Sequence, residues 1–143
     1  MLPRCAASSV HDGSVSTHDP AGSPAGSPAG PAAIGDLSEE LALAHELADL
    51  ADSITLPRYE SRAFSVDWKA NRTEVTEADR ETEARIADVL RTSRPDHALL
   101  GEEHGRHGDP DAEWRWVIDP IDGTSNFVRG IPVWASLIAL VHR

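Results

Sequence analysis

A four-residue unit, Pro-Ala-Gly-Ser, repeats from Pro20 to Gly30 and limits how much of this chain can fold. The repeat contains no large apolar side chain, so it buries too little surface to offset the entropy that a chain loses on ordering. We therefore expect residues 1–35 to form a disordered leader rather than a functional tether. Residues 36–143 then form one modest domain, because 143 residues are too few for two domains of ordinary size.

Charge and composition exclude several classes of partner. The formal net charge is −11 and no basic block is present, which argues against nucleic acid and against an anionic membrane surface. Neither a long apolar run nor a secretory signal is found. The single cysteine, Cys5, excludes an internal disulfide and favours a reducing compartment. We therefore expect a cytoplasmic protein with cations among its partners, and a homodimer is left open.

Two amphipathic helices are expected. The first begins at Asp36, which pairs with Glu39 in an acidic capping box, and ends near Pro57. Its apolar residues recur at helical spacing, at Leu43, Leu47, Leu50 and Ile54. The second helix has Thr76 as its N-cap and ends around Ser93, ahead of a proline.

Extended segments account for the remainder of the ordered chain. Phe64–Thr76 is expected to form a hairpin-like region, and Ala98–Leu100 and Trp114–Ile118 are expected strands. Val133–Val141 is almost continuously apolar and predicts a strand buried on both faces. Two helices ahead of short strands indicate an α/β (α+β layered) domain.

Acidic residues gather where the strand Trp114–Ile118 ends. Asp119 and Asp122 lie three residues apart, with Pro120 between them forcing a turn. Together with the Ile121 carbonyl they offer three oxygen donors, which suits Mg²⁺ or Mn²⁺ better than zinc. Gly123 permits a positive φ or a close backbone approach, and with Thr124 it leaves free N–H groups for a phosphate.

A second pair of acids completes this pattern. Glu102-Glu103 follows the strand Ala98–Leu100, so adjacent strands would bring one glutamate beside Asp119. Two carboxylates 4 Å apart repel by about 4 kcal/mol at an effective dielectric constant near 20, and a cation relieves this. The alternative is a solvated acidic loop without a metal, which the combination of strand, proline, glycine and threonine disfavours.

A haloacid-dehalogenase type of phosphatase is a further alternative, since those enzymes carry Asp-x-Asp-Gly-Thr. Here Pro120 stands two residues before Asp122. The aspartates are therefore one residue too far apart to project together from one strand end, and no covalent phospho-aspartate is implied.

Four segments in matching order resemble the inositol monophosphatase family. They are Val75–Asp79, Gly101–Glu103, Trp116–Thr124 and Asn126-Phe127. The resemblance spans about Asp36 to Arg143, and Ser125–Trp134 is most similar to bacterial histidinol-phosphatases. It implies the N-terminal part of an inositol-monophosphatase-like sugar-phosphatase fold, with two helices packed on a mixed or antiparallel sheet.

The same resemblance implies a site and an activity. The implied activity is Mg²⁺-dependent hydrolysis of a small phosphorylated alcohol, with L-histidinol phosphate (histidine biosynthesis) ahead of myo-inositol monophosphate. The magnesium ligands would be Glu102, Asp119, the Ile121 carbonyl and Asp122, with Asp79 at a further ion or its waters. Thr124, hydrogen-bonded to Asp79, would orient the attacking water that a metal and Glu102 activate. Gly123, Thr124 and the basic residue Lys69 would contact the substrate.

The resemblance also implies a departure from the family. Family members continue through a second subdomain whose Trp-Asp segment supplies another metal-binding aspartate. The sequence contains no such segment, so a truncated, catalytically inactive domain is the alternative of another class.

Other residues have simpler interpretations. His104 and His107 are expected in a loop and not at a metal, and His45 on a helix surface. Tryptophans 114, 116 and 134 are expected in the core or on a sheet face. Arg129 either contacts phosphate or caps a helix, and the sequence leaves both open.

Overall fold

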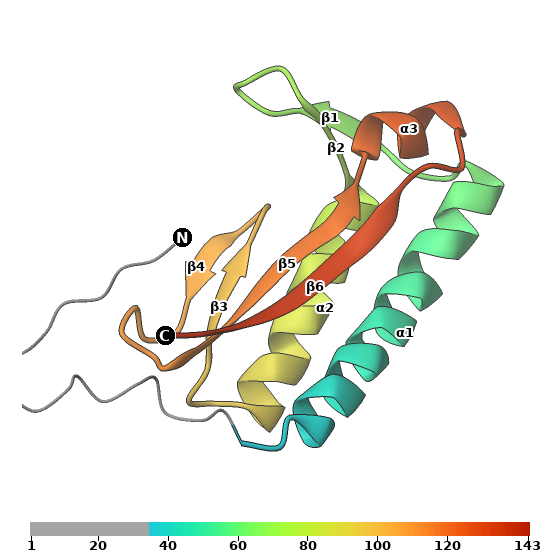
Figure 1. Ribbon diagram of the computed structural model, residues 1–143. Coiled ribbons are helices and arrows are strands. Elements are labelled where there is room, and N and C mark those ends of the chain that lie inside the picture. Colours follow the sequence, from blue (N-terminus) through green and yellow to red (C-terminus); the bar gives the residue numbers. More distant parts are fainter. Residues whose placement is uncertain (1–34) are drawn as a thin grey trace, which may run out of the picture. The chain divides into compact units, whose positions relative to one another are not determined.

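The structure is a computed structural model that describes residues 35–143, so the disordered leader predicted for residues 1–35 lies, but for Gly35, outside the described residues. Two long helices lie side by side along one face of a four-stranded sheet, and a separate hairpin and a short helix lie near one end of it (Figure 1). The elements follow in the order α1 (Ser38–Ser61), β1 (Val66–Trp68), β2 (Glu74–Thr76), α2 (Glu77–Ser93), β3 (Ala98–Gly101), β4 (Gly105–His107), β5 (Trp114–Asp122), α3 (Thr124–Arg129) and β6 (Ala135–His142).

Helix α1 differs from the prediction at both ends. It begins at Ser38 without a side-chain cap, and Asp36 instead accepts hydrogen bonds from the Ser38 amide and hydroxyl, so the Asp36–Glu39 capping box was wrong. The helix also passes through Pro57 and ends at Ser61. The last turn is stabilised by the ring of Tyr59, which packs against aromatic residues far along the chain. The tendency of Pro57 to end the helix is therefore overridden by tertiary packing.

Helix α2 begins where the sequence predicted. The Thr76 hydroxyl accepts hydrogen bonds from the amides of Ala78 and Asp79, and the Asp79 carboxylate accepts one from the Thr76 amide. This capping box satisfies several of the backbone donors that a helix start leaves free. It also fixes the position of Asp79, which becomes important at the site.

The sheet has the order β4-β3-β5-β6, in which β3 and β5 are parallel and the other pairs are antiparallel. The mixed α/β arrangement with two helices on a mixed sheet is confirmed. The hairpin predicted for Phe64–Thr76 is also confirmed, since β1 and β2 pair antiparallel. Strand β4 was missed, because Gly105 and Gly108 favoured a loop there.

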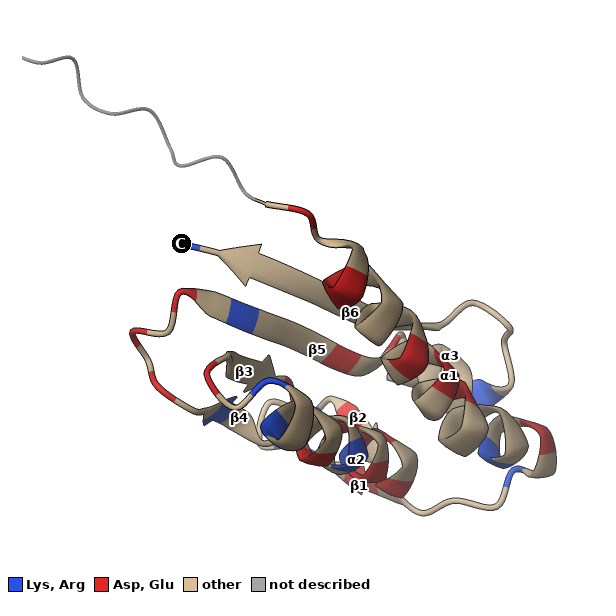
Figure 2. Cartoon of the chain, turned by 90° about the horizontal axis from the view of Figure 1, so that it is seen from below, with Lys and Arg blue, Asp and Glu red and all other residues tan. Residues whose placement is uncertain are grey.

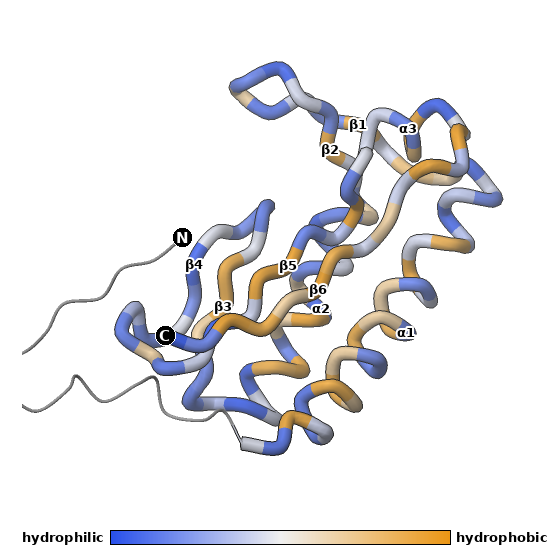
Figure 3. Tube along the Cα trace, in the orientation of Figure 1, coloured by the Kyte–Doolittle hydropathy of each residue, from blue (hydrophilic) through white to orange (hydrophobic). Residues whose placement is uncertain are grey.

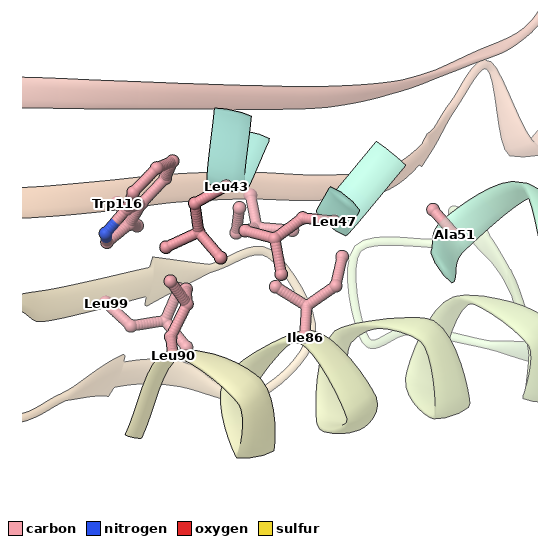
Figure 4. Close-up of a cluster of buried hydrophobic side chains, with 8 residues drawn as sticks. Leu43, Leu47, Ala51, Ile86, Leu90, Leu99 and Trp116 are labelled. Carbon is pink, nitrogen blue, oxygen red and sulfur yellow. The ribbon is translucent and has the colours of Figure 1, made fainter. Parts of the chain in front are cut away.

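The main core fills the space between the helix pair and the sheet (Figure 4). Trp116, which is 1% exposed, contributes the largest side chain of β5 to this core. The other buried members come from α1, α2, β3 and β5, and they are Leu43, Leu47, Ala51, Ile86, Leu90, Leu99 and Ile118. Burying several such side chains stabilises the layer by about 1.5–3 kcal/mol each before entropy is subtracted.

Strand β6 is not buried on both faces, so that prediction was wrong. Its residues alternate between half-buried and exposed, and the exposed fractions of Leu137 and Val141 are 49% and 45%. Ile138 and Leu140 pack against the core while α1 covers that side. The middle of the strand is apolar (Figure 3), but no element within residues 35–143 covers its other face.

Candidate active site

The Asp119–Thr124 segment owes its shape to an irregularity at the end of β5. Pairing between β5 and β6 breaks between Asp119 and Asp122, and Pro120 occupies this break, where no ladder donor is needed. The sequence predicted a turn of the chain at Pro120, and this was wrong. The strand continues to Asp122, and the turn lies at Gly123 (φ 83°). Helix α3 then begins at Thr124.

The parallel pairing of β3 with β5 brings the two acidic segments together. Gly101 is the register partner of Ile118, and the Glu102 amide donates to the Ile118 carbonyl at 3.1 Å. The carboxyl ends of parallel strands lie at the same edge of a sheet, so Glu102 stands beside Asp119. Each of these two carboxyl groups shifts the pKa of the other. The sequence expectation of a glutamate beside Asp119 is confirmed.

Asp79 is buried behind the turn and linked to it by one hydroxyl group. The Thr124 hydroxyl lies 3.2 Å from Asp79 Oδ1 and 3.0 Å from the Ile121 carbonyl oxygen. Thr76 donates from its amide (2.8 Å) and its hydroxyl (2.6 Å) to Asp79 Oδ2. Burial raises the pKa of Asp79, although these hydrogen bonds oppose the rise. Asp79 and Thr124 thus join the start of α2 to the start of α3.

Lys69 joins the acidic cluster from the hairpin side. Its Nζ donates to Glu102 Oε1 at 2.8 Å and to Glu103 Oε1 at 2.7 Å. Burial by itself lowers the pKa of Lys69, but the two glutamates outweigh it and raise that pKa overall. Burial raises the pKa of Glu103 against the opposing effect of Lys69. Lys69, in the turn of the hairpin, therefore forms ion pairs with two of the clustered acids.

The carboxyl groups of Asp119 and Glu102 differ strongly in acidity. Burial, followed by the neighbouring Glu102 carboxyl, raises the pKa of Asp119 from 3.8 to about 7. Burial also acts to raise the pKa of Glu102, but the Lys69 ammonium and the neighbouring Asp119 carboxyl lower it overall. A pair of close carboxyls titrates as a unit, so it holds one proton more tightly than either group would alone.

The donor set of this cluster fits a hard divalent cation. Asp119 Oδ1 is buried without a hydrogen-bond partner among residues 35–143, and such an atom is costly unless something binds it. The remaining donors nearby are the carboxylates of Glu102 and Asp122 and the carbonyl of Ile121. In the described part of the chain, however, no three acidic, histidine or cysteine side chains converge as they would around a bound metal. Binding would therefore require the carboxylates to close on the ion.

The structure places the remaining candidates away from direct chemistry. Arg129 caps the end of α3 by donating to the Ser125 carbonyl at 2.8 Å, and it also pairs with Glu74. His104 approaches the carboxylate of Glu83, whereas His107 lies in β4.

Acidic residues mark the end of β5 near α3 in Figure 2.

Sequence reasoning missed Glu83 in α2. Its carboxylate is 1% exposed and accepts hydrogen bonds from the amides of Glu103 and His104. A signal was present, because Glu83 lies four residues after Asp79 and three before Ile86, on the buried stripe of the helix. An acid on such a stripe is rarely buried without a partner.

Comparisons with known proteins decide the family. The model of the inositol monophosphatase family matches residues 36–143. The chain belongs to the inositol monophosphatase family. This agrees with the resemblance seen in the sequence.

Several relatives within the family are closely similar. Histidinol-phosphatase of Streptomyces coelicolor is 48% identical over 107 residues, covering 75% of this chain and 40% of that protein. Histidinol-phosphatase of Mycobacterium tuberculosis is 48% identical over 105 residues, covering 73% of this chain and 40% of that protein. The crystal structure of the extragenic suppressor protein SuhB from Bartonella henselae superposes with a TM-score of 0.67 at 33% identity, covering 73% and 41% of the two chains. The chain thus spans about 40% of the length of these relatives.

Proposed function

We propose that this chain is a magnesium-dependent phosphomonoesterase that acts on a small phosphorylated alcohol, with L-histidinol phosphate as its leading substrate. The observation that carries the proposal is the parallel pairing of β3 with β5, which puts Glu102 beside an Asp119 oxygen that has no partner in residues 35–143. The substrate rests on the similarity to two histidinol-phosphatases. The alternative substrate is myo-inositol monophosphate, which the family name favours.

The residues that would hold magnesium all supply oxygen. They are the carboxylates of Glu102, Asp119 and Asp122 and the carbonyl of Ile121, with Asp79 at a further ion or its waters. When bound, Mg²⁺ polarises phosphoryl oxygens and makes water more acidic. The Asp119 proton, held by burial and by Glu102, would leave as the cation binds.

The other residues position substrate and water. The amides of Gly123 and Thr124 would donate to phosphate oxygens at the start of α3. The Thr124 hydroxyl, held by Asp79 at 3.2 Å, would orient the attacking water, and Glu102 would accept its proton. Lys69, which already lies among the acids at this end of the sheet, would contact the phosphate. Water would displace the alcohol in line, without a covalent intermediate.

Phosphate release by the full chain tests the proposal. With Mg²⁺, the chain should hydrolyse L-histidinol phosphate faster than myo-inositol monophosphate, and Asp119→Asn should remove this activity. Asp49→Asn is the matched control, because Asp49 is exposed on α1. Equal rates for the chain and the Asp119→Asn variant would contradict the proposal.

A second candidate is a catalytically inactive domain of the same family. The observation that favours it is that Lys69 Nζ already neutralises the proposed ligand Glu102 at 2.8 Å. Binding of Mg²⁺ without release of phosphate from either substrate would support this candidate.

Location, assembly and pathway stay predictions of the sequence: a cytoplasmic protein, a homodimer left open, and a step in histidine biosynthesis. Helices in residues 35–143 are all too short or too polar to span a bilayer.

A further inference from the structure

Glu83 is a buried carboxylate that the proposed reaction does not use. It lies on α2, and both of its oxygens accept hydrogen bonds from the turn between β3 and β4. Oε2 accepts from the Glu103 amide at 2.7 Å, and Oε1 accepts from the His104 amide at 2.8 Å. The His104 Nδ1 atom lies 3.1 Å from the same Oε1. With both oxygens occupied in this way, Glu83 is not itself a metal ligand.

The turn is shaped to fit this carboxylate. A Cβ atom at Gly101 would lie 2.0 Å from Glu83 Oε1, so any side chain at position 101 would push the Glu83 carboxylate out of its place at the end of β3. Gly105, the register partner of Gly101, closes the turn with φ 76°. The three residues between these glycines therefore wrap around a carboxylate supplied by another element, in the manner of an anion bound by consecutive backbone amides.

This turn carries one residue of the proposed site. Glu102 is the first residue after Gly101, and its own amide is fixed to Ile118 of β5 at 3.1 Å. Glu83 fixes the next two amides. The backbone on both sides of the Glu102 Cα atom is therefore held, and the register of β3 with β5 sets Glu102 beside Asp119, the residue after Ile118.

We infer that Glu83 is a positioning residue for the metal ligand Glu102, an inference that rests on the proposed function. Loss of the Glu83 carboxylate leaves two turn amides without their acceptor, and the turn then samples conformations in which Glu102 points away from Asp119. Groups that orient a metal ligand in this way typically change metal affinity by about 10–100-fold when removed.

Metal affinity and amide exchange of the full chain test this inference. Mn²⁺ titration by electron paramagnetic resonance should give a dissociation constant about 100-fold weaker for Glu83→Ala and about 10-fold weaker for Glu83→Gln. The glutamine is nearly isosteric and keeps one acceptor oxygen, so it serves if the alanine variant does not fold. Glu81→Gln is the matched control on an exposed position of the same helix, and its affinity should equal that of the unmodified chain.

A purely structural role for Glu83 predicts a different result. It would lower the melting temperature of the metal-free variants but leave the Mn²⁺ affinity of the folded Glu83→Gln chain within twofold of the unmodified chain. That outcome would overturn the inference.

A failure of the proposed function would give a different set of Mn²⁺ affinities. In that case the unmodified chain and Glu102→Gln would bind Mn²⁺ equally weakly, and the role of Glu83 would be decided by hydrogen exchange of the Glu103 and His104 amides. Faster exchange of these two amides in Glu83→Gln than in Glu81→Gln would support the inference that Glu83 fixes the turn, and unchanged exchange would refute it.

Discussion

Replacing Asp119 by asparagine should stabilise the metal-free chain at pH 8, although the same change removes a proposed metal ligand. Burial and the adjacent Glu102 raise the pKa of Asp119 from 3.8 to about 7. Between these values the folded state holds a proton that the unfolded state has lost, so stability falls as the pH rises from about 4 to about 7. About three pH units correspond to about 4 kcal/mol, and the partial exposure of Asp119 reduces this to about 2 kcal/mol.

Thermal unfolding followed by circular dichroism in EDTA measures this effect. The advantage of Asp119→Asn over the unmodified chain should grow by about 1 kcal/mol between pH 5 and pH 8, because about two of the three pH units lie in this interval, and this is about 4 °C in Tm for a domain of this size. Asp49→Asn should show no such growth. Added Mg²⁺ should then raise the Tm of the unmodified chain and of Asp49→Asn but not that of Asp119→Asn, because a ligand stabilises only a folded state that binds it. An advantage that is the same at both pH values would refute the reasoning about Asp119.

Three further substitutions test packing around the site. Gly101→Ala should lower the free energy of unfolding by about 1–3 kcal/mol in urea titrations, because its Cβ would meet the Glu83 carboxylate; a loss below the error of the titration would contradict this contact. Phe127→Ala should cost about 3–5 kcal/mol by the same measurement, since Phe127 is the fully buried residue of α3 and lies among aromatic rings, and a loss under 1 kcal/mol would show that α3 packs differently. Leu137→Lys should change the free energy of unfolding by less than about 0.5 kcal/mol, since Leu137 is 49% exposed. The same substitution should reduce binding of the hydrophobic dye ANS, and an unchanged ANS signal would show that the dye does not bind the exposed face of β6.

The features that the sequence predicted well are local. Thr76 and Asp79 lie three residues apart and form their capping box within a single helical turn. The Trp114–Ile118 strand and its acidic end are likewise set by alternation and by neighbouring turn residues. Local signals of this kind need no knowledge of which strands pair.

The features that were missed depend on partners far along the chain. The passage of α1 through Pro57 depends on the contact of Tyr59 with Phe127, which lies in α3. The exposed face of β6 depends on which elements cover the sheet, and hydropathy alone does not report that. Glu83 could be recognised as a buried acid, but its partners became visible only when the β3–β4 turn was placed against α2.

The central claim is that Glu102, Asp119, Asp122 and the Ile121 carbonyl form a divalent cation site. Crystals of the chain grown with Mn²⁺ and measured at the manganese absorption edge test it most directly, because anomalous density locates the ion without assuming activity. We predict a peak bounded by these four oxygen donors, with Lys69 displaced from Glu102. Manganese bound only elsewhere on the protein, with the Lys69–Glu102 ion pair intact and Asp119 Oδ1 still without a partner, would contradict the claim.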